Sequence, residues 1–111
     1  GEQDTNNCTQ AAIADETFPI AYSIYNAYPN PFNPFTTLRY DLPEDAMVNI
    51  TIYDMMGRNV KTMVNRQQNA GFKSIQWDAT NDAGAPVSAG LYLYTIESKQ
   101  FRQTKKMVLL K

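Results

Sequence analysis

The sequence contains no histidine and a single cysteine, Cys8, among its 111 residues. Without histidine, the commonest general base of enzymes and the Ser–His and Cys–His catalytic pairs are excluded. One cysteine cannot close an internal disulfide, and zinc sites built from histidine and cysteine are excluded as well. We interpret Cys8 as an incidental thiol, or as a residue whose partner lies outside this sequence.

Long apolar runs and glycine-rich phosphate loops are also missing. No apolar run approaches the ~20 residues of a membrane-spanning helix, and no signal peptide is recognisable, although one could precede this sequence. Oxygen ligands occur together at Asp78, Asn81 and Asp82, a spacing that can hold calcium. The same residues cap turns, and we prefer that interpretation. We therefore predict a non-enzymatic protein without a metal or a cofactor.

The charged residues are unevenly distributed, although the net charge is only −1. Residues 1–38 contain four acidic side chains and no lysine or arginine before Arg39, whereas residues 99–111 contain five basic side chains and no acidic one. A basic segment favours an anionic partner, but lysine also protects exposed sheet edges from unwanted pairing. Lys105 and Lys106 are adjacent and would point to opposite faces of a strand, which argues against a nucleic-acid partner. The five basic residues are Lys99, Arg102, Lys105, Lys106 and Lys111.

A proline-rich motif at residues 28–34 divides the chain. It holds three of the six prolines, and each proline fixes its own φ and keeps the preceding residue extended. We expect a stiff, kinked segment that leads into the first long strand. Residues 1–21 are polar and acidic and predict a weakly ordered linker, with one helical turn conceivable at residues 11–14. Residues 22–111 predict one compact domain.

Alternation of apolar and polar residues dominates this domain. The clearest case is at residues 48–53, where Val48, Ile50 and Ile52 alternate with Asn49, Thr51 and Tyr53. Such segments recur about every 8–12 residues with turn signals between them, which predicts an all-β fold. We expect an immunoglobulin-like or fibronectin-III-like antiparallel β-sandwich of about seven strands. The expected strands are 20–25, 38–42, 48–53, 60–64, 72–78, 91–96 and 101–110.

The core and the turns of this sandwich can also be predicted. Apolar positions that share the inward face of the strands are expected to form the core, with Trp77 as its largest member. Glycines at the breaks between strands are expected in turns. The predicted core residues are Leu38, Tyr40, Ile50, Ile52, Ile75 and Trp77. The predicted turn glycines are Gly57, Gly71, Gly84 and Gly90.

Several segments together resemble a known family. These segments resemble the C-terminal sorting domains, type A, of the type IX (Por) secretion system. They are the motif Tyr-Pro-Asn-Pro-Phe-Asn-Pro at residues 28–34, residues 37–43, 52–57, 71–78 and 84–92, and the terminal run at 105–111. The resemblance covers about residues 25–111, and the family also ends at the terminal run. The domain is also similar to the immunoglobulin-like domain of the flagellar hook-capping protein, in fold more than in role.

The resemblance implies a non-catalytic signal at the end of a larger secreted protein. An outer-membrane translocon would recognise the folded domain and export the upstream cargo from the periplasm of a Gram-negative bacterium, without the domain spanning a membrane. A sortase-like peptidase would then remove the domain and attach the cargo to the cell surface. Residues 1–21 would be the cargo tail or the cleavable linker. The implied recognition residues are Pro29, Asn30, Pro31 and Phe32 in the motif and Lys105, Lys106, Met107, Val108, Leu109, Leu110 and Lys111 in the terminal run.

Two other functions compete with this one. The seven tyrosines could form a sugar-binding platform, which would make the chain a carbohydrate-binding or adhesion module. An assembly scaffold similar to the hook-capping domain is the third candidate. For every implied recognition residue the alternative is a purely structural role, because prolines shape the backbone and residues 107–110 form the last expected strand.

Overall fold

The computed structural model describes residues 18–110, which form seven β-strands and no helix. The prediction of an all-β fold with about seven strands is therefore confirmed. Cys8, Lys111, the helical turn expected at residues 11–14 and most of the expected linker lie outside the described residues. The strands are β1 (Ser23–Ile24), β2 (Thr36–Leu42), β3 (Ala46–Tyr53), β4 (Asn59–Gln68), β5 (Gly71–Trp77), β6 (Gly90–Ser98) and β7 (Phe101–Leu109).

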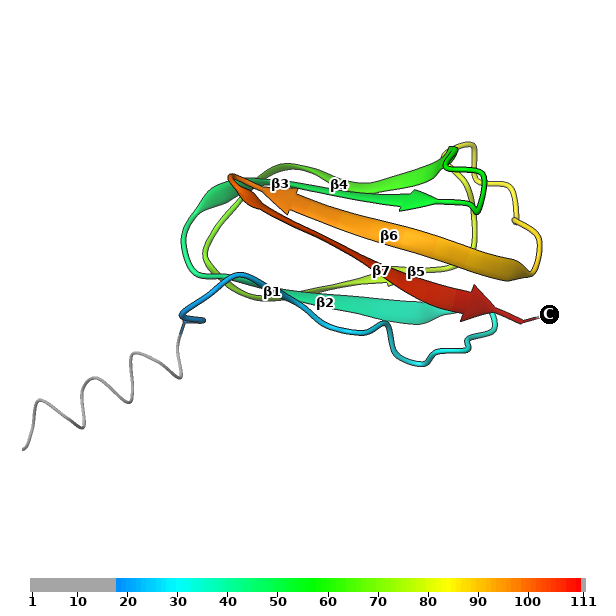
Figure 1. Cartoon of the computed structure of the whole chain (residues 1–111), viewed down its shortest axis with the longest axis horizontal. Coiled ribbons are helices and arrows are strands. Elements are labelled where there is room, and N and C mark those ends of the chain that lie inside the picture. The colour runs from blue at the N-terminus through cyan, green and yellow to red at the C-terminus, as the bar shows by residue number, and fades with distance from the viewer. Residues whose placement is uncertain (1–17, 111) are drawn as a thin grey trace, which may run out of the picture.

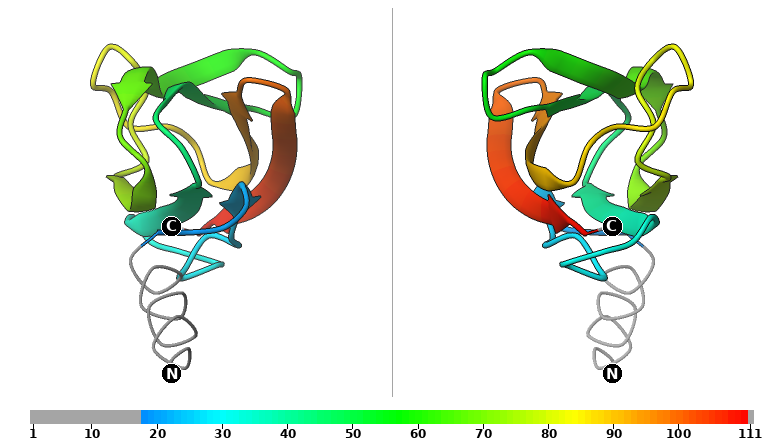
Figure 2. Two further views of the ribbon diagram at one scale, coloured as in Figure 1. Left: turned by 90° about the vertical axis from the view of Figure 1, so that its left-hand side faces the viewer. Right: turned by 90° about the vertical axis from the view of Figure 1, so that its right-hand side faces the viewer.

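The strands form two antiparallel sheets that face each other as a sandwich (Figure 1). One sheet has three strands in the order β1-β2-β5, and the other has four in the order β4-β3-β6-β7. Strand β6 lies between β3 and β7, which fits its apolar residues on both faces. Strand β7 is an edge strand, and the segment around Phe32 bonds to its C-terminal end (Figure 2). The sequence runs directly from β6 into β7 through a two-residue turn.

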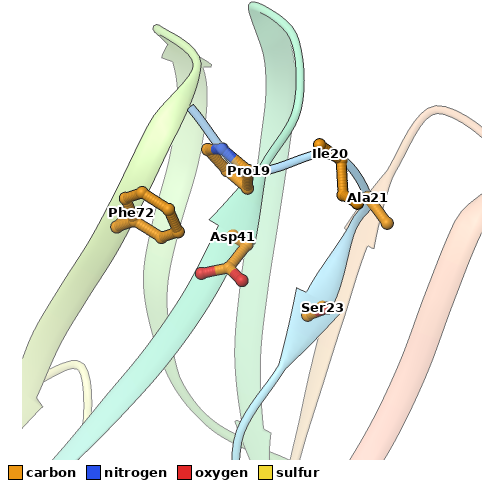
Figure 3. Close-up of a pocket in the computed structure, with 6 residues that line it drawn as sticks. All are labelled: Pro19, Ile20, Ala21, Ser23, Asp41 and Phe72. Carbon is orange, nitrogen blue, oxygen red and sulfur yellow. The ribbon is translucent and has the colours of Figure 1, made fainter. Parts of the chain in front are cut away.

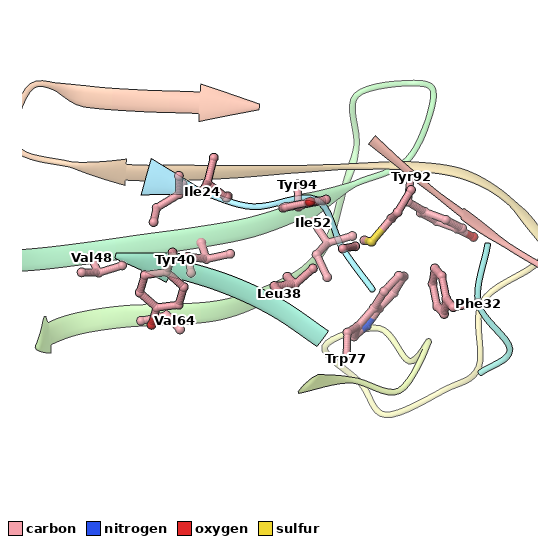
Figure 4. Close-up of a cluster of buried hydrophobic side chains, with 14 of the residues drawn as sticks. Ile24, Phe32, Leu38, Tyr40, Val48, Ile52, Val64, Trp77, Tyr92 and Tyr94 are labelled. Carbon is pink, nitrogen blue, oxygen red and sulfur yellow. The ribbon is translucent and has the colours of Figure 1, made fainter. Parts of the chain in front are cut away.

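The core lies between the two sheets, and Trp77 occupies one end of it (Figure 4). The Trp77 ring has no exposed surface and packs against Phe32 and Tyr92, with ring centroids 5.6 and 5.4 Å away. Its indole N–H donates to the carbonyl oxygen of Thr80 (2.8 Å), so the polar atom of the ring is satisfied. The buried set also includes four other residues expected from the alternation, Leu38, Tyr40, Ile50 and Ile52.

Two expectations about individual residues need correction. Ile75 is only partly buried, because β5 is an edge strand and one side of its inner face borders solvent. Gly71 was expected in a turn, but it is the first residue of β5. Strand β4 also extends beyond the expected range 60–64 to Gln68, because an edge strand does not require an apolar face. Gly90 is likewise the first residue of β6, whereas Gly57 and Gly84 lie in turns with φ of +82° and +85°.

Within residues 18–110, the fold has no helix that is both long and apolar enough to cross a membrane.

Candidate functional site

The proline-rich motif lies against the outer edge of β7. The backbone N–H of Phe32 donates to the carbonyl of Val108 (3.0 Å), and the N–H of Leu110 donates to the carbonyl of Phe32 (2.9 Å). Phe32 and Leu109 thereby form a parallel β-bridge. Figure 2 shows the two segments side by side, with the motif in cyan and β7 in red. The two segments expected to carry recognition, far apart in the sequence, thus form one structural unit.

The side chain of Asn30 extends this contact along β7. Its Oδ1 accepts a hydrogen bond from the N–H of Val108 (2.9 Å), and its Nδ2 lies 3.4 Å from the carbonyl oxygen of Lys106, to which it donates. The amide therefore substitutes for the backbone of a pairing strand, since it carries both a donor and an acceptor. A side chain is needed here because Pro29 and Pro31, on either side of Asn30, have no N–H to donate.

The motif is also anchored to the opposite sheet. Tyr28 and Thr37 exchange two backbone hydrogen bonds (2.9 and 3.1 Å), and the hydroxyl of Thr36 donates to the carbonyl of Pro29 (2.8 Å). Phe32 then enters the core with only 2% of its surface exposed. The motif therefore crosses from β2 to β7 and closes one side of the sandwich, which gives the expected stiff segment a structural role.

Within the terminal run, alternate residues have different environments. Met107 and Leu109 belong to the core, with 0% and 1% of their surface exposed, so their role is structural. Lys106 and Leu110 are exposed, while Lys105 and Val108 are partly buried. The surface that the terminal run offers to a partner therefore comes mainly from its lysines and from Leu110.

Replacing Asn30 by alanine should loosen the contact between the motif and β7 without emptying the core. We expect a loss of about 0.5–1.5 kcal/mol in the free energy of unfolding, because two exposed hydrogen bonds are exchanged for bonds to water. Hydrogen exchange at the Val108 amide should become faster, and NMR measures both effects. Asn33→Ala is the matched control, since Asn33 also precedes a proline but its side chain makes no hydrogen bond within the described residues. Equal acceleration in both variants would contradict the role assigned to Asn30.

An open groove lies next to Asn30, at the middle of β7. It has a volume of about 470 Å³ and contains two lysines and two asparagines. Within residues 18–110, neither lysine forms an ion pair, whereas Lys99 pairs with Glu44 and Arg102 pairs with Glu97, each at 3.1 Å. The groove is therefore basic. Its lining residues are Asn26, Asn30, Leu93, Thr104, Lys105 and Lys106.

A second hollow, of about 250 Å³, lies on the outer face of the three-stranded sheet (Figure 3). Pro19 and Ile20 pass over it, and Asp41 of β2 and Phe72 of β5 line its floor. Asp41 accepts a hydrogen bond from the hydroxyl of Tyr25, and this bond raises the pKa of Tyr25. Asp41 is buried at 7% exposure, whereas Phe72 remains 58% exposed at the side of the hollow.

The three side chains considered as calcium ligands all accept hydrogen bonds from other residues. Asp78 accepts from the Thr80 hydroxyl, Asn81 Oδ1 from the N–H of Ala85 (2.9 Å) and Asp82 Oδ1 from the N–H of Thr62 (3.0 Å). The bond from Thr80 lowers the pKa of Asp78. The part of the chain that the structure describes contains no cluster of three or more acidic, histidine or cysteine residues able to hold a metal.

Three of the seven tyrosines are buried and cannot contribute to a sugar-binding platform. Tyr40, Tyr92 and Tyr94 are buried, and the Tyr94 hydroxyl donates to the carbonyl of Tyr25 (2.9 Å). Burial raises the pKa of Tyr94 to about 12. Tyr28 is 76% exposed, but the Tyr25 ring is stacked under the guanidinium of Arg39, 5.1 Å from its centroid.

Comparison with solved structures finds similar domains in larger proteins. Dimeric latent PorU from Porphyromonas gingivalis is 25% identical with a TM-score of 0.63, over 81% of this chain and 9% of the PorU chain. PorZ, an essential surface component of the type IX secretion system of P. gingivalis, is 18% identical with a TM-score of 0.53, over 82% of this chain and 12% of that chain. The chain therefore corresponds to a small part of each protein.

FlgD proteins share the same fold. FlgD from P. aeruginosa is 21% identical with a TM-score of 0.53, over 71% of this chain and 67% of that chain. A comparison with curated proteins finds no match. The FlgD Ig-like domain family matches residues 35–100, so the proline-rich motif up to Pro34 and all of β7 lie outside the matched range. The match nevertheless covers more than half of the sequence, and the chain therefore belongs to the FlgD Ig-like domain family.

Proposed function

We propose that this chain is a non-catalytic C-terminal sorting domain of the type IX secretion system, type A. An outer-membrane translocon recognises the folded domain and exports the cargo that precedes it in the same polypeptide. A sortase-like peptidase then acts on the exported protein. The domain thus passes through the periplasm and reaches the cell surface or the medium of a Gram-negative bacterium.

One observation carries this proposal. The two motifs that resemble sorting domains lie at residues 28–34 and 105–111, and their described parts, 28–34 and 105–110, pack against each other on one edge of the sandwich, where Phe32 pairs with Val108 and Leu110. Both lie outside the range that matches the FlgD Ig-like domain family. The edge that these two motifs form is where recognition is proposed. The similarity to PorU and PorZ supports the assignment to type IX secretion.

A fusion experiment tests the proposal. The full 111-residue chain is fused to the C-terminus of a fluorescent reporter that carries an inner-membrane export signal, in a bacterium with a type IX system. We expect the reporter at the cell surface or in the medium, at levels at least tenfold above those of the reporter without the domain. Fractionation followed by fluorescence and immunoblotting measures the distribution.

Two controls give this experiment its specificity. A strain without the outer-membrane translocon should retain the fusion in the periplasm. A second fusion carries the immunoglobulin-like domain of P. aeruginosa FlgD, which has the same fold at 21% identity. Export of both fusions to the same extent would show that the fold alone suffices, and retention of the first fusion in the wild-type strain would refute the sorting function.

A further inference from the structure

The outer edge of β7 consists of a covered part and an open part. At Val108 and Leu110 the backbone groups that point away from β6 are bonded to Asn30 and Phe32. In an antiparallel pair, successive residues point their backbone N–H and C=O groups alternately toward and away from the partner strand. The backbone groups of Val108 point away from β6. The backbone N–H and C=O groups of Arg102, Thr104 and Lys106, at every second position before it, must therefore point away from β6 too.

The open part of the β7 edge comprises residues 102–106, on the N-terminal side of the contact with Asn30. The carbonyl of Lys106 already accepts from Asn30, but within the described residues no backbone or side-chain group bonds to the outward N–H groups of Arg102, Thr104 and Lys106. The open edge therefore offers three N–H donors and the carbonyls of Arg102 and Thr104. The groove beside Asn30 adjoins this segment, since Thr104, Lys105 and Lys106 line it. Unpaired edges of this kind can accept an added strand.

The charges next to this edge indicate what would bind it. Arg102, Lys105 and Lys106 lie in the open segment. Within residues 18–110, Arg102 forms an ion pair with Glu97, and neither lysine forms one. A second copy of this chain is a poor occupant. Antiparallel pairing of two β7 edges about Thr104 would place Lys106 opposite Arg102 of the other copy, and like charges opposite each other destabilise a pair.

We propose that residues 102–106 form a strand-docking site for an extended acidic peptide segment of the secretion machinery, with Asn30 fixing where the added strand ends. The identity of the partner rests on the proposed sorting function, whereas the site itself rests on the edge geometry and the charge. Arg102 and Lys106 share one face of β7 and are four residues apart. A matching strand therefore carries two acidic side chains four residues apart on one face.

A defined peptide tests the site directly. The probe has the sequence Thr-Val-Glu-Val-Thr-Val-Glu-Val-Thr, and the control probe has lysine in place of both glutamates. Titration into the 15N-labelled full chain should shift the amide signals of Arg102, Thr104 and Lys106 and slow their hydrogen exchange. The control probe should bind at least ten times more weakly. Shifts confined to other residues, equal binding of the two probes, or self-association through β7 without peptide would overturn the proposal.

Two variants of Thr104 distinguish the contribution of its backbone N–H to peptide binding from that of its side chain. Thr104→Pro and Thr104→Ala both remove the hydroxyl contact with Thr95 (2.8 Å), but only proline removes the outward N–H. Proline is tolerated on edge strands when its missing N–H would face solvent. We expect the proline variant to bind the probe at least ten times more weakly than the alanine variant. Equal affinities would overturn strand addition at this edge.

A charge variant covers the case in which Thr104→Pro does not fold, as judged by its thermal unfolding. Lys105→Glu/Lys106→Glu leaves every backbone group in place and should weaken binding of the acidic probe at least tenfold. Unchanged binding in this variant would overturn the charge argument.

The reporter fusion distinguishes this proposal from the sorting function. If the parent fusion is exported and the Thr104→Pro fusion is exported as well as the Thr104→Ala fusion, the docking site is refuted while the sorting function stands. If the parent fusion itself remains in the periplasm, the sorting function is refuted, and the peptide titration decides about the edge independently.

Discussion

Deletion of residues 105–111 is expected to unfold the domain, and not merely to remove a signal. The deletion takes away Met107 and Leu109, which are almost completely buried, and the half of β7 that pairs with residues 90–94 of β6. Truncating one buried methionine or leucine to alanine typically costs about 2–5 kcal/mol, and a small domain has about 5–15 kcal/mol in total. We expect the truncated chain to show no cooperative transition in urea, followed by circular dichroism.

This outcome changes how a secretion defect of the truncated chain must be interpreted. A loss of export could follow from unfolding alone, so a variant that alters only the surface is needed. Lys105→Gln/Lys106→Gln keeps Met107 and Leu109 in place and should change the free energy of unfolding by less than about 1 kcal/mol, as is usual for surface substitutions. A truncated chain as stable as this variant would contradict the structural role of the terminal strand.

Replacing Trp77 by alanine is expected to have the largest effect of any single substitution. The ring is completely buried, contacts Phe32 and Tyr92, and satisfies the carbonyl of Thr80. Removal of a buried tryptophan leaves a cavity and typically costs about 3–5 kcal/mol. Because Phe32 belongs to the proline-rich motif, we also expect faster hydrogen exchange at the Leu110 amide, which bonds to Phe32. Urea unfolding and exchange NMR measure the two effects.

Ile75→Ala is the matched control for this substitution. Ile75 lies on the same strand and the same face as Trp77, two residues away, but it is only partly buried. Its truncation should cost about 2 kcal/mol or less and leave exchange at Leu110 unchanged, because less apolar area is removed. A loss of stability at Trp77 no larger than that at Ile75 would contradict the view that Trp77 anchors the core and the motif.

Much of the fold could be predicted from local patterns. Alternation at residues 48–53 reflects a strand with one face in the core, and Val48, Ile50 and Ile52 of β3 are buried as this pattern indicates. The strand begins earlier than expected, at Ala46, and Thr51 on its other face is buried as well. Strand β6 is apolar on both faces, which fits its position between two neighbouring strands. Edge strands were less predictable, because their polar residues do not need to alternate. The extension of β4 to Gln68 and the partial exposure of Ile75 are both consequences of an edge position.

The sequence by itself determined the fold class of the protein and excluded some kinds of catalytic site. Missing histidine excluded the common catalytic pairs, period-two alternation required strands, and three prolines in residues 28–34 ruled out a helix there. Only the tertiary structure decided that these prolines and the last strand belong together. Asn30 and Lys106 are 76 positions apart, and their contact depends on where the edge of the second sheet lies. No local pattern encodes that distance, so neither the covered part of β7 nor its open part could be known before the sheets were assembled.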